Sequence, residues 1–167
     1  MKLLIVICII AIALLCLSGC KNSNTTGDKP VVSICGKVIR VLDGDTIKIH
    51  SKNDDWVYTI RLHGIDAPEK KQPYGREAQH YLMNLIDDRE VTAIIRNKDK
   101  YGRYIATVIY KDVDINAEMV EAGLAWHYTR YDNNFKYAEL MHKAIGAKRG
   151  LWKDEAPIKP ENFRYKP

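Results

Sequence analysis

Cysteine is scarce in this sequence, and the four cysteines are unevenly placed. Cys8, Cys16 and Cys20 lie among the first 20 residues, which leaves Cys35 as the single cysteine of the remaining chain. A disulfide within that remaining chain is therefore excluded, and no cysteine pair supports a zinc site. The five histidines are scattered, and no two have the spacing of metal ligands.

The sequence also lacks an apolar run long enough for a comfortable transmembrane helix. Its longest apolar run, residues 3–17, has 15 residues, whereas a helix that crosses a bilayer needs roughly 20. Lys2 before this run and the small residues after it are typical of a secretory signal peptide. Residues 1–19 are therefore predicted to be a signal peptide and to contribute nothing to the fold.

The residues that follow the apolar run predict a lipid anchor. Leu17-Ser18-Gly19-Cys20 resembles the lipobox of bacterial lipoproteins, in which the cysteine is acylated and becomes the mature N-terminus. The resemblance implies lipidation at Cys20 and an extracytoplasmic position in the cell envelope. Residues 21–30 are polar and rich in turn formers, so residues 20–30 are predicted to be a flexible tether. An ordinary cleaved signal, which would give a secreted protein, and an uncleaved anchor are the alternatives.

Charge of one sign is not abundant either. The chain has 26 Lys and Arg against 21 Asp and Glu, a formal charge of +5, which becomes +4 once Lys2 is removed with the leader. This modest excess is compatible with a nucleic-acid partner but does not identify one. About 137 residues remain from residue 31 onward, enough for one domain with a core.

Hydrophobic periodicity predicts a mixed α+β domain over residues 31–153. Alternating apolar residues indicate three strands joined by short turns, then an amphipathic helix, two more strands and two helices, followed by an irregular tail over residues 154–167. The predicted ranges are strands 31–41, 46–50 and 56–65, helix 74–87, strands 90–96 and 103–110, a short helix that ends at Gly123, and a helix capped by residues 132–134. This order suits an antiparallel sheet or a small closed barrel of the oligonucleotide/oligosaccharide-binding (OB) type.

Charged residues gather at the predicted turns and strand ends. They are four acidic residues and two arginines: Asp43, Asp45, Asp66, Glu69, Arg61 and Arg103. Carboxylates can hold a hard cation such as Ca²⁺, and arginine binds phosphate in a bidentate manner, so the set suits phosphoryl chemistry. Glu69 has the longest reach of the carboxylates and is the candidate base. A structural network of ion pairs is the alternative.

Three sequence blocks resemble the signature blocks of the staphylococcal-nuclease-like (thermonuclease) family. They are residues 41–46 (Val-Leu-Asp-Gly-Asp-Thr), 61–69 (Arg-Leu-His-Gly-Ile-Asp-Ala-Pro-Glu) and 99–103 (Asp-Lys-Tyr-Gly-Arg). They occur in the family's order, and the similarity extends through residues 123–125 and 150–152 to cover about 38–152. The resemblance implies a five-stranded OB-fold barrel with three helices.

The same resemblance implies a Ca²⁺-dependent hydrolase that cleaves DNA and RNA at the P–O5′ bond and leaves 3′-phosphates. The protein is expected to be a monomer. By this resemblance, Asp45, Asp66 and the Ala67 carbonyl would ligate Ca²⁺, and Glu69 would activate or position water. Arg61 and Arg103 would bind the scissile phosphate, and Lys100 and Tyr101 would approach a terminal phosphate. Tyr128 or Tyr131 would stack on a base. Two features depart from the family pattern. Ala67 replaces a threonine, which leaves a backbone ligand intact, and the segment 126–131 is one residue shorter, which leaves open which tyrosine stacks.

Two other classes of function remain open from the sequence. A non-catalytic OB-fold lipoprotein that binds single-stranded nucleic acid would use the positive charge and the tyrosines, although binding alone does not need carboxylates beside a phosphate site. A structural envelope lipoprotein would use the same charges as surface ion pairs.

Overall fold

Strand pairing dominates the fold of the part of the chain that the computed structural model describes, residues 32–164. The predicted signal peptide, the lipidation site Cys20 and the tether lie outside these described residues. Among the residues described, no helix combines the length and the apolar character that a membrane span requires.

The secondary-structure elements follow the predicted order, with additional short ones. In chain order they are β1 Ser33–Val41, β2 Thr46–Ser51, β3 Val57–Leu62, β4 Ile65–Asp66, α2 Gly75–Ile86, β5 Glu90–Lys98, β6 Tyr104–Tyr110, β7 Val113–Asp114, α3 Ile115–Glu121, β8 Trp126–His127, α4 Phe135–Gly146, the 3₁₀ helix η1 Gly150–Lys153 and α5 Pro160–Arg164.

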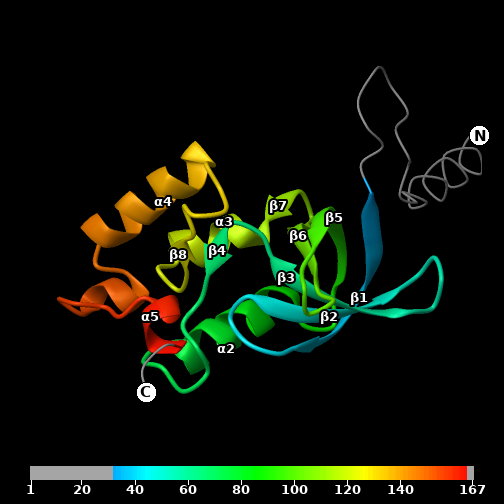
Figure 1. Ribbon diagram of the computed structural model, residues 1–167, viewed down its shortest axis with the longest axis horizontal. Coiled ribbons are helices and arrows are strands. Elements are labelled where there is room, and N and C mark those ends of the chain that lie inside the picture. Colours follow the sequence, from blue (N-terminus) through cyan, green and yellow to red (C-terminus); the bar gives the residue numbers. More distant parts are fainter. Residues whose placement is uncertain (1–31, 165–167) are drawn as a thin grey trace, which may run out of the picture. The chain divides into compact units, whose positions relative to one another are not determined.

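Five of the strands close into a barrel (Figure 1). The order in the sheet is β3-β2-β1-β5-β6-β7, and β3 also pairs with β6 in parallel, with Ile60 opposite Tyr104. The other strand pairs of this sheet are antiparallel. The closed five-stranded barrel with helices confirms the predicted fold class.

The core fills the barrel and the space beneath the helices. Alternating residues of the strands point inward, so Ile47, Ile49 and Ile60 are fully buried. Helix α2 adds Leu82 and Ile86, which are also fully buried. Burial of apolar surface at about 25 cal/mol per Å² stabilises this arrangement and holds the strand ends in place.

Capping residues mark the end of α3 and the start of α4 where the sequence predicts. Gly123 follows α3 with φ +70°, and its amide and that of Leu124 donate to the carbonyls of Val120 and Met119, 3.0 Å away in both cases. This is a Schellman motif, which glycine favours because it adopts positive φ without strain. Asn134 caps α4 by accepting a hydrogen bond from the Lys136 amide at 3.0 Å.

The predicted third strand, residues 56–65, is wrong in one respect. Gly64 has φ +73° and breaks the strand, so β3 ends at Leu62 and the chain leaves the barrel. Beyond this break β4 pairs with β8, with Ile65 opposite His127 and Asp66 opposite Trp126. Asp66 is thus carried by a separate two-stranded ribbon, formed by β4 and β8.

The C-terminal segment also differs from the predicted irregular tail. Residues 160–164 form the short helix α5, and Pro160 is buried. The reason is long-range contact with the region around β4, described below, which local sequence patterns do not reveal.

Candidate active site

Arg61 joins two buried carboxylates at the end of β3. Its Nη1 lies 2.9 Å from Asp45 Oδ2, and its Nη2 lies 2.8 Å from Asp66 Oδ1. Asp45 is 7% exposed and Asp66 is 2% exposed. Arg61 also donates to the carbonyls of Leu62 and Ile65, at 3.2 and 3.0 Å. The guanidinium is therefore held at a fixed place between the two acids.

Strand register explains why these residues meet. Thr46, the first residue of β2, pairs with Arg61 of β3, and Asp45 directly precedes it. The Asp45 carboxylate accepts hydrogen bonds from the Ala67 amide at 2.8 Å and from the Thr46 hydroxyl at 3.0 Å. These bonds connect the loop after β4 to the start of β2, so four predicted site residues, Asp45, Arg61, Asp66 and Ala67, form one cluster.

Glu69 stands at the mouth of this cluster and is less buried. Its side chain is 38% exposed, and its backbone amide donates to Gln72 Oε1 at 3.1 Å. The backbone amide of the buried Gln72 donates to the Glu69 carbonyl at 2.7 Å. Gly75 packs so closely that a Cβ there would lie 1.9 Å from the Glu69 carbonyl oxygen. The loop that presents Glu69 is therefore fixed by its hydrogen bonds with Gln72 and by close packing against Gly75.

Arg103 lies near this cluster in the fold but has a different partner. It directly precedes Tyr104, which pairs with Ile60 next to Arg61. Its Nε donates to Asp99 Oδ2 at 2.7 Å, and its guanidinium lies 5.6 Å from the Tyr101 ring centroid. In residues 32–164 no hydrogen bond or ion pair joins Arg103 to Asp45, Asp66 or Glu69.

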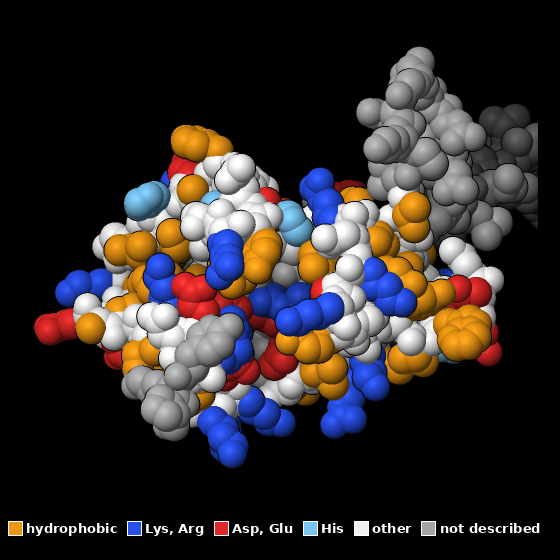
Figure 2. All heavy atoms as spheres, viewed as in Figure 1, with side chains coloured by type: hydrophobic (Ala, Val, Ile, Leu, Met, Phe, Trp, Pro, Cys, Tyr) orange, Lys and Arg blue, Asp and Glu red, His pale blue; other side chains and the backbone are white. Residues whose placement is uncertain are grey.

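Lys100 and Tyr101 lie in the same β5–β6 loop as Arg103. Lys100 Nζ lies 5.1 Å from the Tyr101 ring centroid, and that ring is exposed. The structure therefore places these two residues with Arg103 on the rim and outside the buried cluster. Figure 2 shows acidic side chains gathered near the middle of one face, with Lys and Arg side chains around them.

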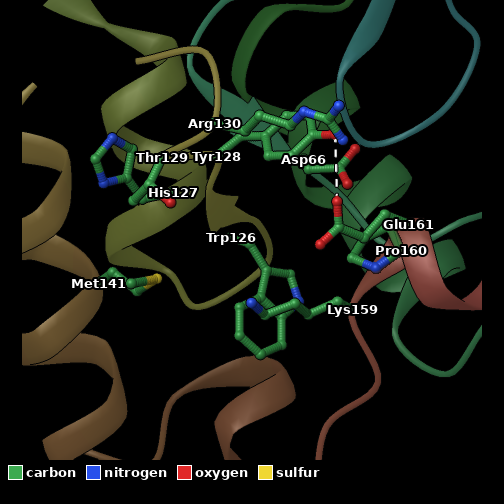
Figure 3. Close-up of a pocket in the computed structure, with 10 residues that line it drawn as sticks. All are labelled: Asp66, Trp126, His127, Tyr128, Thr129, Arg130, Met141, Lys159, Pro160 and Glu161. Atoms are coloured by element: carbon green, nitrogen blue, oxygen red, sulfur yellow. Dashed lines mark hydrogen bonds between the residues drawn. The ribbon is translucent and has the colours of Figure 1, made fainter. Parts of the chain in front are cut away.

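Tyr128 lies beside Asp66 in a cavity of about 280 Å³. Figure 3 shows Tyr128 next to Asp66. The Tyr128 hydroxyl donates to Glu161 Oε2 at 3.4 Å. The Tyr131 ring meets the Tyr128 ring edge to face, at a centroid distance of 5.0 Å, and is exposed. Of the two tyrosines, only Tyr128 lines the cavity.

The sequence of the chain matches a known protein family. The family described as staphylococcal nuclease homologue matches residues 59–154, more than half of the chain. The chain belongs to the staphylococcal nuclease family.

Several relatives of this family carry nuclease names. The chain is 40% identical over 134 residues to a protein of Escherichia coli O157:H7 named an uncharacterized endonuclease. The aligned region covers 80% of this chain and 86% of the relative. The chain is 34% identical over 148 residues to a Haemophilus influenzae protein with the same name, covering 89% and 78%. A probable staphylococcal-like nuclease of rice is 39% identical over 127 residues, covering 74% and 34%.

The site residue that sequence analysis missed is Arg164. Its Nη2 lies 3.0 Å from Asp66 Oδ2, and its Nη1 lies 2.6 Å from Glu69 Oε1. It belongs to α5, about a hundred residues after the carboxylates that it contacts. No sequence motif or hydrophobic periodicity marks Arg164 as a site residue. The sequence shows only that the tail from residue 157 is rich in proline and charge.

In this member of the staphylococcal nuclease family, the carboxylates of the buried cluster are the type of ligand that a divalent cation prefers. Asp45 and Asp66 face the same guanidinium, and a hard cation prefers such oxygen ligands. The described part of the chain has no group of three or more His, Cys, Asp or Glu side chains placed to hold a metal. Two carboxylates therefore have to be supplemented by a backbone carbonyl, water or substrate oxygens.

Asp43 gives a test of the electrostatics beside this cluster. Burial and the negative charge of Asp45 raise the pKa of Asp43 to about 7, from an ordinary value of 3.8. The folded protein thus holds the proton more tightly than the unfolded chain does, so this group's contribution to stability is complete below pH 3.8 and declines as the pH rises to about 7. Above that range both states are ionised, and the folded state carries a desolvated anion.

We expect Asp43→Asn to raise the melting temperature at pH 8.5 by roughly 5 °C and to have a smaller effect at pH 5. The asparagine side-chain oxygen can still accept the Asp45 amide, which the Asp43 carboxylate now accepts at 3.0 Å. Thermal unfolding in chelator measures the effect, with the exposed Asp87→Asn as control. Equal stabilisation at both pH values would contradict this titration.

Proposed function

We propose that the protein is a Ca²⁺-dependent, sugar-nonspecific nuclease that hydrolyses DNA and RNA at the P–O5′ bond and leaves 3′-phosphates. The observation that carries this proposal is the buried Asp45–Arg61–Asp66 cluster with Glu69 at its mouth. Two buried acids joined by one arginine are costly to desolvate, and replacing such a group by apolar residues often stabilises a protein. The presence of this buried charge at a strand end therefore supports a ligand-binding role over a structural one.

In this proposal, the residues divide the work of phosphodiester hydrolysis. A cation bound by Asp45, Asp66 and the Ala67 carbonyl would polarise a phosphate oxygen. Arg61 binds the scissile phosphate and stabilises the charge of the five-coordinate transition state. Glu69 is exposed enough to contact water and accepts its proton, or orients it for attack.

The rim residues complete the substrate path. Arg103 exchanges its contact with Asp99 for a phosphate oxygen when substrate arrives, which is feasible because the Arg103 side chain is about one third exposed. Lys100 and Tyr101, in the same loop, approach a terminal phosphate. Tyr128 stacks a base, because it lines the cavity next to Asp66, and Tyr131 supports its ring from the side.

The test is a plasmid-nicking assay on the folded unit, residues 31–167, with Ca²⁺, with Mg²⁺ and with chelator. We expect cleavage in Ca²⁺, loss of at least 100-fold in chelator, and 3′-phosphate ends on the products. Salt-sensitive binding of nucleic acid without cleavage would favour the alternative, a non-catalytic OB-fold binding protein. A melting temperature that did not respond to Ca²⁺ plus a nucleotide bisphosphate would favour a structural protein.

We also propose that the nuclease acts as a monomer anchored in the cell envelope through acylated Cys20. The support is the lipobox-like Leu17-Ser18-Gly19-Cys20 and a site assembled within one chain. Fractionation of cells that express the full sequence tests the anchor. Activity found in the medium instead of the membrane fraction would show that the lipobox is not used.

A further inference from the structure

The C-terminal segment, residues 158–164, is attached to the loop that carries Glu69. The buried Gln72 donates from Nε2 to the Ile158 carbonyl at 2.6 Å, while its Oε1 accepts the Glu69 amide at 3.1 Å. One side chain therefore connects the start of this segment to the backbone of the candidate base. The attachment fixes where α5 begins, near β4 (Figure 1).

At the other end of the segment, Arg164 binds the functional carboxylates themselves. Its two terminal nitrogens lie 3.3 and 3.0 Å from the two oxygens of Asp66, and Nη1 also lies 2.6 Å from Glu69 Oε1. Both oxygens of Asp66 thus accept hydrogen bonds from this arginine. Charge-assisted bonds of this kind are among the stronger contacts in proteins.

Arg164 and a divalent cation would use the same oxygens. Arg61 contacts one oxygen of Asp45 and Oδ1 of Asp66. Arg164 contacts Oδ1 and Oδ2 of Asp66 and also Glu69 Oε1, so it occupies both oxygens of one proposed metal ligand. A cation on Asp66 would either share these oxygens with Arg164 or displace it, and in both cases the positive charge of the cation repels the guanidinium. Occupation of the site by the cation and docking of Arg164 therefore oppose each other.

We propose that Arg164 is a positioning residue of the active site, an internal cation that holds Asp66 and Glu69 until a divalent cation binds and releases it. This inference rests on the proposed function, because it requires that Asp66 ligates the cation. The segment 158–164 is then a strap that is docked without the cation and loosened with it.

The remaining contacts of α5 suit reversible docking. The helix has five residues, too few to be stable alone. Of these residues only Pro160 is buried, and the Arg164 side chain is 39% exposed. The bond from the Tyr128 hydroxyl to Glu161, drawn as a dashed line in Figure 3, is long, at 3.4 Å. Release of Arg164 therefore breaks few contacts, while Gln72 keeps residue 158 attached.

Thermodynamic linkage makes this proposal measurable in two directions. If docking of Arg164 weakens cation binding by some factor, cation binding weakens docking of the strap by the same factor. We expect Arg164→Gln to bind Ca²⁺ about tenfold more tightly than the unchanged protein, a typical strength for coupling between two sites. We also expect Ca²⁺ to speed amide hydrogen exchange in residues 160–164 of the unchanged protein.

The experiment is calorimetric titration of Ca²⁺ into residues 31–167 without nucleic acid, so the result does not depend on cleavage. The control is Arg149→Gln, another partly exposed arginine that contacts a carboxylate, 3.6 Å from Glu121 Oε1 and away from the site. Arg164→Lys keeps the charge but loses the bidentate geometry, so its affinity for Ca²⁺ should lie between those of the unchanged protein and Arg164→Gln. Circular dichroism confirms that each variant is folded.

The outcomes separate this inference from the proposed function. Tighter binding in Arg164→Gln alone supports it, whereas equal or weaker binding overturns it and leaves a Ca²⁺ nuclease in place. Faster exchange of residues 160–164 on addition of Ca²⁺ adds support, and unchanged exchange counts against release. If neither protein binds Ca²⁺, both this inference and the Ca²⁺ dependence of the proposed nuclease are wrong.

Discussion

Replacing Arg61 with glutamine is expected to lower the rate of DNA cleavage by at least 10³-fold and to destabilise the protein without metal. Among residues 32–164, Arg61 is the one side chain that forms ion pairs with both Asp45 and Asp66. Loss of a single preorganised charge-stabilising donor costs about 10²–10³-fold. Loss of phosphate binding adds to this. The assay is the rate of plasmid nicking in saturating Ca²⁺.

The stability effect has a separate cause. Without Arg61 the Asp45 carboxylate keeps its bonds from Ala67 and Thr46 but loses its countercharge. Breaking a buried ion pair from one side costs about 3–5 kcal/mol. Since Ca²⁺ would supply positive charge to the same oxygens, we expect it to restore more stability to the Arg61→Gln protein than it adds to the unchanged one.

Arg103→Gln is the matched comparison for Arg61→Gln. Arg103 is also a proposed phosphate ligand, but its side chain is partly exposed and its partner Asp99 lies on the rim. We expect a large loss of activity with little loss of stability. An Arg61→Gln protein that retained more than a tenth of the cleavage rate would contradict the role assigned to Arg61.

The barrel could be predicted from sequence because its signals are local. Alternation of apolar residues marks each strand, and Asp45 and Arg61 fall on neighbouring strands once the hairpin between them is short. The break at Gly64 was missed because alternation continues through it, and its φ of +73° depends on a turn that periodicity does not report. That break turns Asp66 out of the barrel and toward β8.

The missing part of the site is missing for a different reason. Arg164 meets Asp66 across 98 positions of sequence, in a helix of five residues that is too short to show a 3.6-residue period. The contact exists because Gln72 and the buried Pro160 bring the segment back to the Glu69 loop. Tertiary packing of this kind is not encoded in any one stretch, so only the folded chain reveals it.

Replacing Glu69 with glutamine is expected to lower kcat by about 10²–10⁴-fold, the usual contribution of a general base, with little change in KM for DNA. Glutamine keeps the size of the side chain and can still accept a bond from Arg164, but it cannot take a proton from water. Because the Glu69 side chain is 38% exposed, we expect the melting temperature to change little. Initial rates of cleavage against substrate concentration measure the effect.

Glu77→Gln serves as the control for Glu69→Gln, since Glu77 is an exposed acid in the first turn of α2 and lies outside the cluster. Full activity in Glu69→Gln would remove Glu69 from the reaction.

The contact with Arg164 offers a competing explanation, in which Glu69 matters only because it holds the strap. A double variant, Glu69→Gln with Arg164→Gln, separates the two. If Glu69 served only to hold Arg164, the double variant would be no slower than Arg164→Gln alone, because residues that act through one contact are not additive. If Glu69 activates water, its replacement costs the same large factor whether or not Arg164 is present.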